Sequence, residues 1–226
     1  MVVLEKPSQI TVKPVAEKPQ TKIKIRKVER INGSRLFLFI KRTVDILFSF
    51  VGLCVAILPM LIVGVIVKID SKGPAIYKQE RLGLNGKSFN MYKFRSMRID
   101  AEKDGARWAD KDDDRVTTVG KILRKFRIDE LPQLFNVLVG DMSFVGPRPE
   151  RQCFYEEFAT YIDGFEQRLA VKPGITGWAQ VCGGYELAPE EKVLFDIEYM
   201  ENRSIAMDVK CLVSTVMVVL KGDGSR

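Results

Sequence analysis

The chain contains no histidine among its 226 residues. This absence excludes histidine general bases, Ser-His and Cys-His nucleophilic dyads, and zinc sites with histidine ligands. Its four cysteines, Cys54, Cys153, Cys182 and Cys211, lie far apart and form no CxxC pair, so we expect neither a thiolate metal site nor a disulfide framework. A reducing compartment fits this cysteine usage best. Any catalysis must therefore depend on carboxylates, lysine, arginine or a bound metal ion.

Positive charge is in excess, because 36 Lys and Arg face 29 Asp and Glu and give a formal net charge of +7. Such a balance suits nucleic acid, an anionic membrane surface or a phosphorylated substrate, and charge alone does not choose among these partners. The length and the 46% hydrophobic content are typical of one folded domain with an appendage.

The amino-terminal part of the chain changes character abruptly. Residues 1–34 are rich in Lys, Pro, Gln and Glu without apolar periodicity, which predicts a disordered basic arm. The next segment, 35–70, contains the run from Ile46 to Val67, which carries no charge. At about 1.5 Å per residue this run is long enough to cross a hydrocarbon core of about 30 Å. We therefore predict a membrane helix over 35–70.

Two features favour a re-entrant helix over a spanning one. Pro59 interrupts the helical hydrogen bonding and predicts a bend. Both flanks are basic, which satisfies the positive-inside preference only if both ends stay in the cytoplasm. The flanking residues are Arg35, Lys41 and Arg42 on one side and Lys68, Lys72, Lys78 and Arg81 on the other. We predict a helix broken at Pro59 that returns to its leaflet and a cytoplasmic catalytic domain over 71–226; an ordinary kinked spanning helix is the alternative.

The remaining pattern predicts a mixed α/β fold that is mostly helical and has a small β-hairpin. Ala75 to Phe94 alternates apolar and polar residues around Asn85-Gly86, a favoured turn pair. The acid-rich stretch from Asp100 to Asp114 predicts a solvated loop that could serve as a mobile lid. Met207 to Leu220 is an apolar helix too short to span, so it packs on the domain or lies at the membrane interface.

The stretch RIDELPQLFNVLVGDMSFVGPRPE, Arg127 to Glu150, places two acids beside each other before a short apolar run. Asp129 has the form of an N-cap, Pro132 is tolerated in a first turn and Gly140 suits the C-terminal cap, so we predict a helix over Glu130–Val139. A carboxylate at a helix N-terminus is stabilised as an anion, so we expect Asp129 to be ionised at neutral pH. Simple capping is the structural alternative for both acids.

The neighbouring arginines favour a role in phosphoryl transfer. Arg124 and Arg127 precede the acids, and Arg148 follows them between two prolines. An arginine on a stiff backbone is suited to bidentate capture of phosphate. One carboxylate could attack phosphorus while the other holds Mg²⁺ and the arginines stabilise the charge on the phosphoryl oxygens. The residue types permit this chemistry without deciding between it and a structural role.

Several motifs stand out along the chain. The main ones are KFRSM (Lys93 to Met97), DDRVTTVGKILRKFRIDELPQLFNVLVGDMSFVGPRPE (Asp113 to Glu150) and KPGITGWAQV (Lys172 to Val181). Shorter ones are KRTVD (Lys41 to Asp45), DSKGPAIYKQERLG (Asp70 to Gly83) and FDIEYM (Phe195 to Met200). Together they resemble the bacterial sugar transferase family, the monotopic polyprenyl-phosphate phosphoglycosyl transferases that begin capsule and exopolysaccharide assembly, and the resemblance covers about residues 36 to 220.

The resemblance implies a membrane enzyme at the cytoplasmic face of the bacterial cell membrane. It would transfer a hexose 1-phosphate from a UDP-sugar, with glucose or galactose favoured, to undecaprenyl phosphate and release UMP through a covalent aspartyl phospho-sugar. Asp129 is then the nucleophile and Glu130 the ligand of Mg²⁺. Arg124 and Arg148 would contact substrate phosphate, and Lys93 and Arg95 would line the site. The implied partners are both substrates and the membrane, with no nucleic acid; a homo-oligomer is left open.

Two departures from the family pattern limit what the resemblance implies. Leu58 precedes Pro59 where many relatives have serine, and Cys182-Gly183-Gly184-Tyr185 follows GWAQV where many relatives read NGR. The sugar is therefore not assigned from this loop. Two other functions remain as alternatives: a membrane-bound scaffold or regulatory protein without catalysis, and a lipid-linked phosphatase that uses water as the acceptor.

Overall fold

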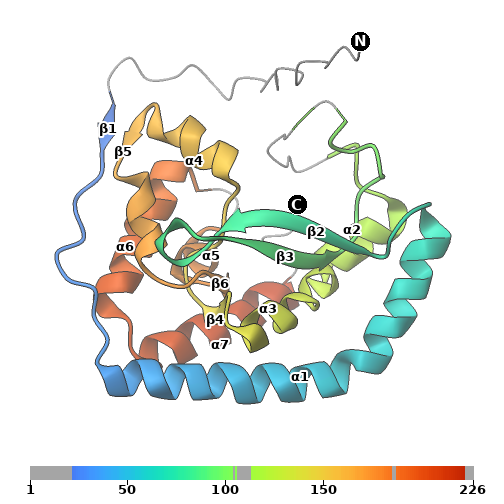
Figure 1. Ribbon diagram of the computed structural model, residues 1–226, viewed down its shortest axis with the longest axis horizontal. Helices are drawn as coiled ribbons and strands as arrows, with labels where there is room; N and C mark the ends of the chain where they lie inside the picture. Colours follow the sequence, from blue (N-terminus) through green and yellow to red (C-terminus); the bar gives the residue numbers. More distant parts are fainter. Residues whose placement is uncertain (1–21, 104, 106–112, 185–186, 222–226) are drawn as a thin grey trace, which may run out of the picture.

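The computed structural model describes residues 22–103, 105, 113–184 and 187–221, and it has the expected mixed α/β, mostly helical fold (Figure 1). The helices are α1 Arg35–Asp70, α2 Thr118–Lys125, α3 Gln133–Val139, α4 Gln152–Ala159, α5 Trp178–Cys182, α6 Pro189–Asn202 and α7 Ile205–Lys221. The shorter 3₁₀ helices are η1 Leu84–Gly86, η2 Ile128–Glu130 and η3 Phe165–Ala170. The strands are β1 Ile23–Lys24, β2 Ile76–Leu82, β3 Ser88–Phe94, β4 Ser143–Val145, β5 Ile162–Asp163 and β6 Gly174–Thr176.

The strands pair two by two. The predicted hairpin is confirmed, because β2 and β3 are antiparallel with Ile76 opposite Phe94 and Leu82 opposite Ser88. At its tip Asn85 and Gly86 both have positive φ, at 56° and 75°, which is the conformation that the Asn-Gly pair favours. The other two pairs, β1 with β5 and β4 with β6, are parallel and short.

Helix α1 is a single helix that remains helical through Pro59. Ser34 caps its first turn by accepting a hydrogen bond from the amide of Phe37. The helix is long and apolar enough to cross a membrane by length and composition, and only 6% of its most apolar window is buried inside the protein. Its C-terminal part turns away from the direction of the rest (Figure 1). Because this apolar surface is not core, it needs a partner outside the domain.

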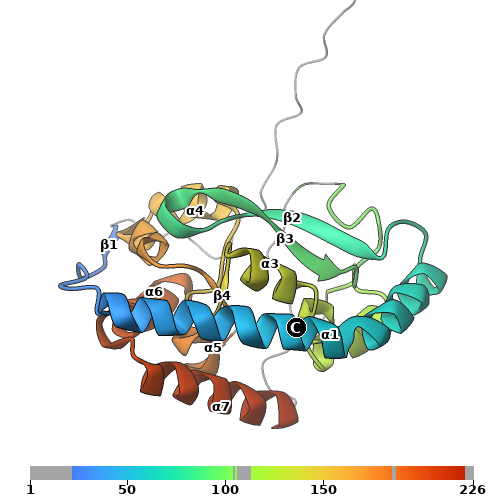
Figure 2. The same cartoon turned by 60° about the horizontal axis from the view of Figure 1, so that its bottom comes forward.

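Both ends of α1 contact the same domain. Near the start, Lys41 pairs with Asp208 of α7, with Nζ 2.5 Å from Oδ2. Near the end, Val67 is buried in a small cluster with Phe94 of β3 and Leu123 of α2. The helix therefore runs along the length of the domain, as Figures 1 and 2 show.

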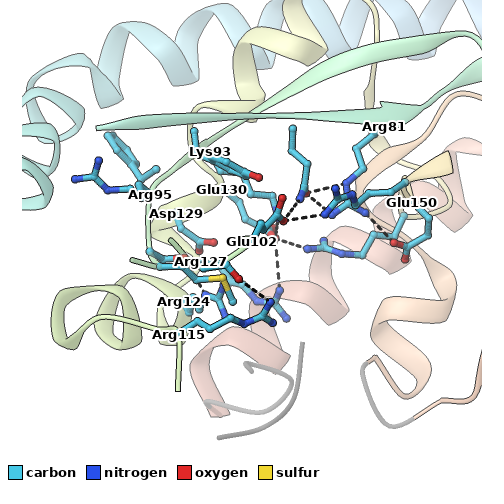
Figure 3. A pocket seen from close by; sticks show the side chains of 18 of the residues that line it. Arg81, Lys93, Arg95, Glu102, Arg115, Arg124, Arg127, Asp129, Glu130 and Glu150 are labelled. Carbon is cyan, nitrogen blue, oxygen red and sulfur yellow. Dashed lines mark hydrogen bonds and ion pairs between the residues drawn. The ribbon is translucent and has the colours of Figure 1, made fainter. Parts of the chain in front are cut away.

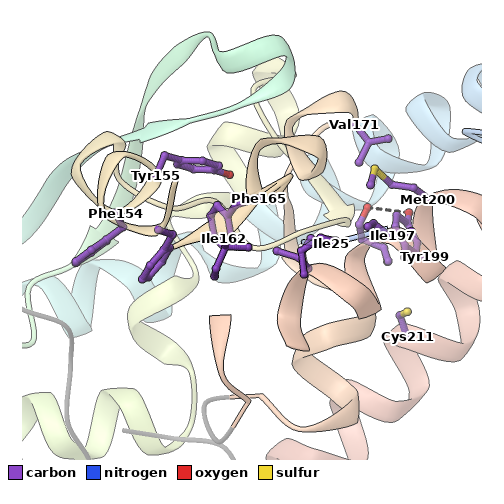
Figure 4. Close-up of a cluster of buried hydrophobic side chains, with 13 residues drawn as sticks. Ile25, Phe154, Tyr155, Ile162, Phe165, Val171, Ile197, Tyr199, Met200 and Cys211 are labelled. Carbon is purple, nitrogen blue, oxygen red and sulfur yellow. Dashed lines mark hydrogen bonds between the residues drawn. The ribbon is translucent and has the colours of Figure 1, made fainter. Parts of the chain in front are cut away.

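The main core joins α4, η3 and α6 (Figure 4). Aromatic side chains contact one another edge to face, with ring centroids 4.9 Å apart for Phe158 and Phe165 and 5.1 Å apart for Tyr155 and Phe165. Val193 and Ile197 of α6 are fully buried against them. This core fixes η3 and α6, which contribute Arg168 and Lys192 to the lining of the cavity described below.

Part of the arm that the sequence predicts as disordered is folded onto this core. Ile25 is buried in the main cluster, and Arg26 forms two hydrogen bonds of 2.7 Å with the carboxylate of Glu201 in α6. Strand β1 also pairs with β5. The prediction of disorder is therefore wrong for residues 22–34, which lie on the domain surface. This segment is too short to show an apolar periodicity in the sequence, yet it buries Ile25. Residues 1–21 lie outside the described part.

Helix α7 confirms the predicted apolar helix near the C-terminus and packs on the domain. Cys211 is fully buried, and the hydroxyl of Thr215 lies 2.6 Å from that of Thr176 in β6. Its other face is apolar and exposed, at Val209, Val213, Val216 and Met217. Both views place α7 beside the N-terminal half of α1 (Figures 1 and 2).

Candidate active site

A cavity of about 520 Å³ lies between the β2–β3 hairpin, α2 with η2, and the segment after β4 (Figure 3). This volume suits a small-molecule ligand. The acidic side chains in its lining are Glu102, Asp129, Glu130 and Glu150. The basic ones are Arg81, Lys93, Arg95, Arg98, Arg115, Arg124, Arg127, Arg148, Arg151, Arg168 and Lys192. The excess of positive charge indicates a ligand with several negative charges.

The two adjacent acids lie in η2 and not in the predicted helix. Helix α3 begins at Gln133 with Pro132 at the capping position, so the prediction that Asp129 caps a helix over Glu130–Val139 is wrong at its start. The end is as predicted, because Gly140 has a φ of 100°. Between α2 and η2, Arg127 has a left-handed φ of 56°, unusual for a residue with a side chain. This reversal of the chain directs both acids into the cavity.

Glu130 is surrounded by basic side chains. Its Oε1 lies 2.6 Å from Nη2 of Arg148, 3.5 Å from Nζ of Lys93 and 3.7 Å from Nη1 of Arg127. Burial by itself would raise the pKa of the Glu130 carboxyl, but Arg148, Lys93 and Arg127 outweigh burial and hold the pKa below its usual value. Glu130 is therefore an anion at neutral pH.

Asp129 has the opposite environment. It is buried, and its Oδ1 has no hydrogen-bond partner among the described residues. Burial and the negative charge of Glu130 raise the pKa of the Asp129 carboxyl, against the opposing influence of Lys93, Arg124 and Arg148. The expectation from the helix terminus was a stabilised anion; because the helix begins later, burial dominates instead. A desolvated carboxylate oxygen without a donor is suited to nucleophilic attack.

Arg124 reaches the cavity through a close contact between α2 and the segment after β3. A Cβ on Gly120 would lie 2.0 Å from the carbonyl oxygen of Ser96, so only glycine allows this approach. Arg124 then donates from Nε to Oγ of Ser96 at 2.9 Å. This bond leaves the guanidinium beside Asp129, as Figure 3 shows.

Lys93 lies near the end of β3 and Arg95 directly follows the strand, but their side chains face different partners. Lys93 faces Glu130, whereas Arg95 points away from it (Figure 3). The Nη2 of Arg95 donates to the carbonyl oxygens of Ser71, at 2.5 Å, and Val67, at 3.3 Å, at the C-terminal end of α1. Arg95 also lines the cavity, so it links the end of α1 to the cavity. Its Nε and Nη1 have no hydrogen-bond partner among the described residues.

The residues present fit Mg²⁺ only together with a phosphorylated ligand. Among the described residues no three Asp, Glu, His or Cys side chains cluster as a dedicated cation site. Glu130 offers one ionised carboxylate, and Mg²⁺ commonly binds through one or two carboxylates together with substrate phosphates. The surrounding arginines and lysine oppose binding of a cation by itself.

The sequence did not single out the basic residues at the far end of the cavity. Arg81 of β2 donates to Oε2 of Glu150 at 2.8 Å, and Arg151 donates to Oε1 of Glu102 at 2.8 Å. Glu102 belongs to the predicted acidic loop, of which residues 104 and 106–112 lie outside the described part. The sequence did contain a sign of these residues, because Arg81 lies within the motif YKQERLG and Arg151 directly follows the motif GPRPE.

Comparison with known proteins gives one family and several named relatives. The family model described as bacterial sugar transferase matches residues 36–222. A UDP-N-acetylgalactosamine-undecaprenyl-phosphate N-acetylgalactosaminephosphotransferase of Aeromonas hydrophila is 43% identical over 85% of this chain and 46% of its own length. The chain thus spans about half the length of that relative.

Two further relatives have similar names. A Bacillus subtilis protein, provisionally named as an undecaprenyl-phosphate N-acetylgalactosaminyl 1-phosphate transferase, is 56% identical over 59% of this chain and 74% of its own length. A UDP-glucose:undecaprenyl-phosphate glucose-1-phosphate transferase of Xanthomonas campestris pv. campestris is 43% identical over 71% of this chain and 34% of its own length. The names agree in the lipid acceptor and differ in the sugar.

Proposed function

The chain belongs to the bacterial sugar transferase family, and on that premise we propose that it transfers a sugar 1-phosphate from a UDP-sugar to undecaprenyl phosphate and releases UMP. The reaction would be the first membrane step of exopolysaccharide or capsule synthesis. The observation that carries the proposal is the buried Oδ1 of Asp129 in a basic cavity, which has no hydrogen-bond partner among the described residues and lies beside a Glu130 that is held ionised. A carboxylate oxygen without a hydrogen-bond donor, among arginines that can bind phosphate, suits covalent phosphoryl transfer.

The proposed reaction has two displacement steps at one phosphorus atom. In the first, the Asp129 carboxylate attacks the phosphorus that bears the sugar, a P–O bond to Asp129 forms, and the bond to UMP breaks. In the second, a phosphate oxygen of the lipid attacks the same phosphorus and the Asp129 carboxylate leaves. Arg124 and Arg148 would bind the equatorial oxygens, and Lys93 would offset their charge. Mg²⁺, held by Glu130 and the diphosphate, would supply charge neutralisation for departing UMP.

The sugar is proposed only as a class. Relatives with similar identity are named for N-acetylgalactosamine or for glucose. The expected hexose therefore has to be tested beside N-acetylhexosamines. Gly184 lies in the cavity lining, at the position of arginine in the NGR sequence of the family pattern, and glycine has no side chain with which to contact the sugar.

The position of α1 supports attachment to one leaflet. Lys41 near its start and Val67 near its end both contact the one folded domain. A helix that crossed a hydrocarbon core of about 30 Å would place its ends on opposite sides, which is incompatible with both contacts. We infer a re-entrant helix bent near Pro59, with the domain on the cytoplasmic side, where the basic flanks are favoured. The exposed apolar face of α7, beside α1, would rest at the same interface.

Intact mass spectrometry tests this function. The full chain in detergent is incubated with Mg²⁺ and a panel of UDP-hexoses and UDP-N-acetylhexosamines without lipid, while exchange of labelled UMP into UDP-sugar is followed. We expect a sugar-phosphate mass gain and exchange with one donor, both lost in Asp129→Asn and retained in Asp163→Asn, an exposed control on β5.

Each other outcome has a definite meaning. Turnover with lipid but without adduct or exchange would indicate one direct displacement and would remove the nucleophilic role of Asp129. Release of free sugar phosphate without lipid would indicate a phosphatase. Unchanged function in Asp129→Asn would favour the scaffold alternative.

A further inference from the structure

The segment that carries Arg148 is held through its carbonyl groups. It reads Gly146-Pro147-Arg148-Pro149-Glu150, and its two prolines have no N–H with which to anchor it. Instead, four consecutive carbonyl oxygens each accept a hydrogen bond from another part of the chain. The donors are, in order, Gly174 N (2.9 Å), Arg168 Nη2 (3.1 Å), Arg81 Nη1 (3.1 Å) and Leu82 N (3.0 Å).

The donor to Arg148 itself is a buried side chain. Arg168 of η3 is only 3% exposed, and its Nη2 donates to the carbonyl oxygen of Arg148. The same guanidinium forms an ion pair with Asp196 of α6, with Nε 2.9 Å and Nη2 2.8 Å from Oδ2. The centroid of the Phe165 ring lies 5.0 Å from the guanidinium carbon of Arg168. Two elements of the main core therefore fix the orientation of one hydrogen-bond donor.

Resting on the proposed function, we propose that Arg168, oriented by Asp196, is a positioning residue that sets the place of Arg148 in the active site. A continuous series of contacts leads from Asp196 through Arg168 and the backbone of Arg148 to Glu130. Its last contact is the 2.6 Å bond from Nη2 of Arg148 to Oε1 of Glu130. In this proposal Asp196, which belongs to the FDIEYM motif, acts on the site by orienting Arg168 and does not itself contact the substrate.

The chemistry of arginine explains why this position needs a guanidinium. Its planar fork makes the ion pair with Asp196 and the bond to the carbonyl of Arg148 at the same time. A lysine has a flexible ammonium and cannot keep both directions fixed. A shift of about 1 Å in a group that positions substrate costs up to about 100-fold in rate. We therefore expect Arg168→Lys to reduce turnover by roughly 10- to 100-fold.

A double-mutant cycle separates positioning from general damage. Arg168→Lys is made with Arg148 intact and with Arg148→Ala, and each full-length protein is assayed for UDP affinity by calorimetry and for the rate of sugar-phosphate adduct formation. A second set, Arg168→Gln with Asp196→Asn, replaces the ion pair by two amides, so that no buried charge loses its partner. Glu201→Gln, which breaks an exposed ion pair on α6, is the matched control.

The expected result is a loss in UDP affinity and adduct rate when Arg148 is present, little further loss when Arg148 is alanine, and no loss in the control. Losses that multiply equally in both backgrounds would overturn the positioning role. Full activity of a folded Arg168→Lys chain would overturn it as well. A wild-type chain that neither binds UDP nor forms an adduct would overturn the proposed transfer, and this role with it.

Discussion

Removing the carboxylate of Asp45 should destabilise the whole protein, because this residue attaches α1 to the domain. Asp45 lies in α1, is 4% exposed, and accepts hydrogen bonds of 3.1 Å from the hydroxyl of Ser143 and from the amide of Phe144 in β4. In Asp45→Ala both donors remain buried without this acceptor. Each unpaired buried polar group costs about 1–3 kcal/mol, so the lost acceptor by itself would lower the free energy of unfolding by about 2–6 kcal/mol. Burial also raises the pKa of the Asp45 carboxyl, so removal of the buried charge offsets part of this loss, and we expect a net fall near the lower end, about 2 kcal/mol. At roughly 2–4 °C per kcal/mol for a chain of this size, Tm should fall by at least about 4 °C.

The assay is thermal unfolding of the purified full-length protein in detergent. Ser143→Ala removes one donor and should cost less than half as much as Asp45→Ala. Thr43→Val, two residues before Asp45 on an exposed face of α1, should leave Tm unchanged within about 1 °C, because among the described residues its hydroxyl bonds to the carbonyl oxygen of Phe39 in the same helix. A loss below about 1 kcal/mol in Asp45→Ala, or an equal loss in Thr43→Val, would refute the inference that this contact holds α1 in place.

Four further predictions concern the site and helix α1. Because burial and Glu130 raise the pKa of Asp129, and only the anion attacks, the rate of adduct formation should fall with decreasing pH at a midpoint above the ordinary 3.8; a midpoint at or below 3.8 would contradict this. The folded state binds this proton more tightly than the unfolded state, so Asp129→Asn should retain or raise Tm at pH 7 although it is inactive, and a clear fall in Tm would oppose this reasoning. Glu130→Gln should weaken the Mg²⁺ dependence of adduct formation, and an unchanged metal titration would remove that role. Single cysteines at Ile40 and Asp70 should both be labelled from the cytoplasmic side of sealed vesicles, whereas labelling from opposite sides would mean a spanning helix.

The sequence predicted those helices and turns that depend on neighbouring residues, from the local residue pattern and from the length of the uncharged run. The long apolar helix, the Asn85-Gly86 hairpin tip, the Gly140 helix end and the C-terminal helix all follow from interactions within a few residues. The association of Asp129 with Arg148 was also predicted, because it rests on a contiguous motif. What failed was the helix start: the chain reverses at Arg127 and buries Asp129 and Glu130 in η2, so Asp129 does not cap the helix that begins at Gln133.

The far side of the cavity could not be predicted from local pattern. Arg81 and Arg168 are separated from the acidic pair by long stretches of chain, and they meet it only after the hairpin and η3 pack on the core. An isolated arginine in a sequence is most often a solvated surface residue. The buried partner that identifies Arg168, Asp196, lies 28 residues away in another helix, so only the tertiary structure reveals the pair.

Under the proposed function, the attachment of α1 at both ends affects transfer to the lipid acceptor. Arg42 donates to the carbonyl oxygens of Val137 and Leu138, in the last turn of α3. Arg95 donates to the carbonyl oxygens of Val67, in the last turn of α1, and of Ser71, which follows it. Two residues separate helix α3 from η2, so these contacts connect α1 to the segment that carries the proposed nucleophile. The depth of α1 in the leaflet would then fix the height of Asp129 above the lipid phosphate. Loosening either attachment should therefore slow transfer to lipid more than adduct formation from the soluble UDP-sugar, because only the second step depends on that height.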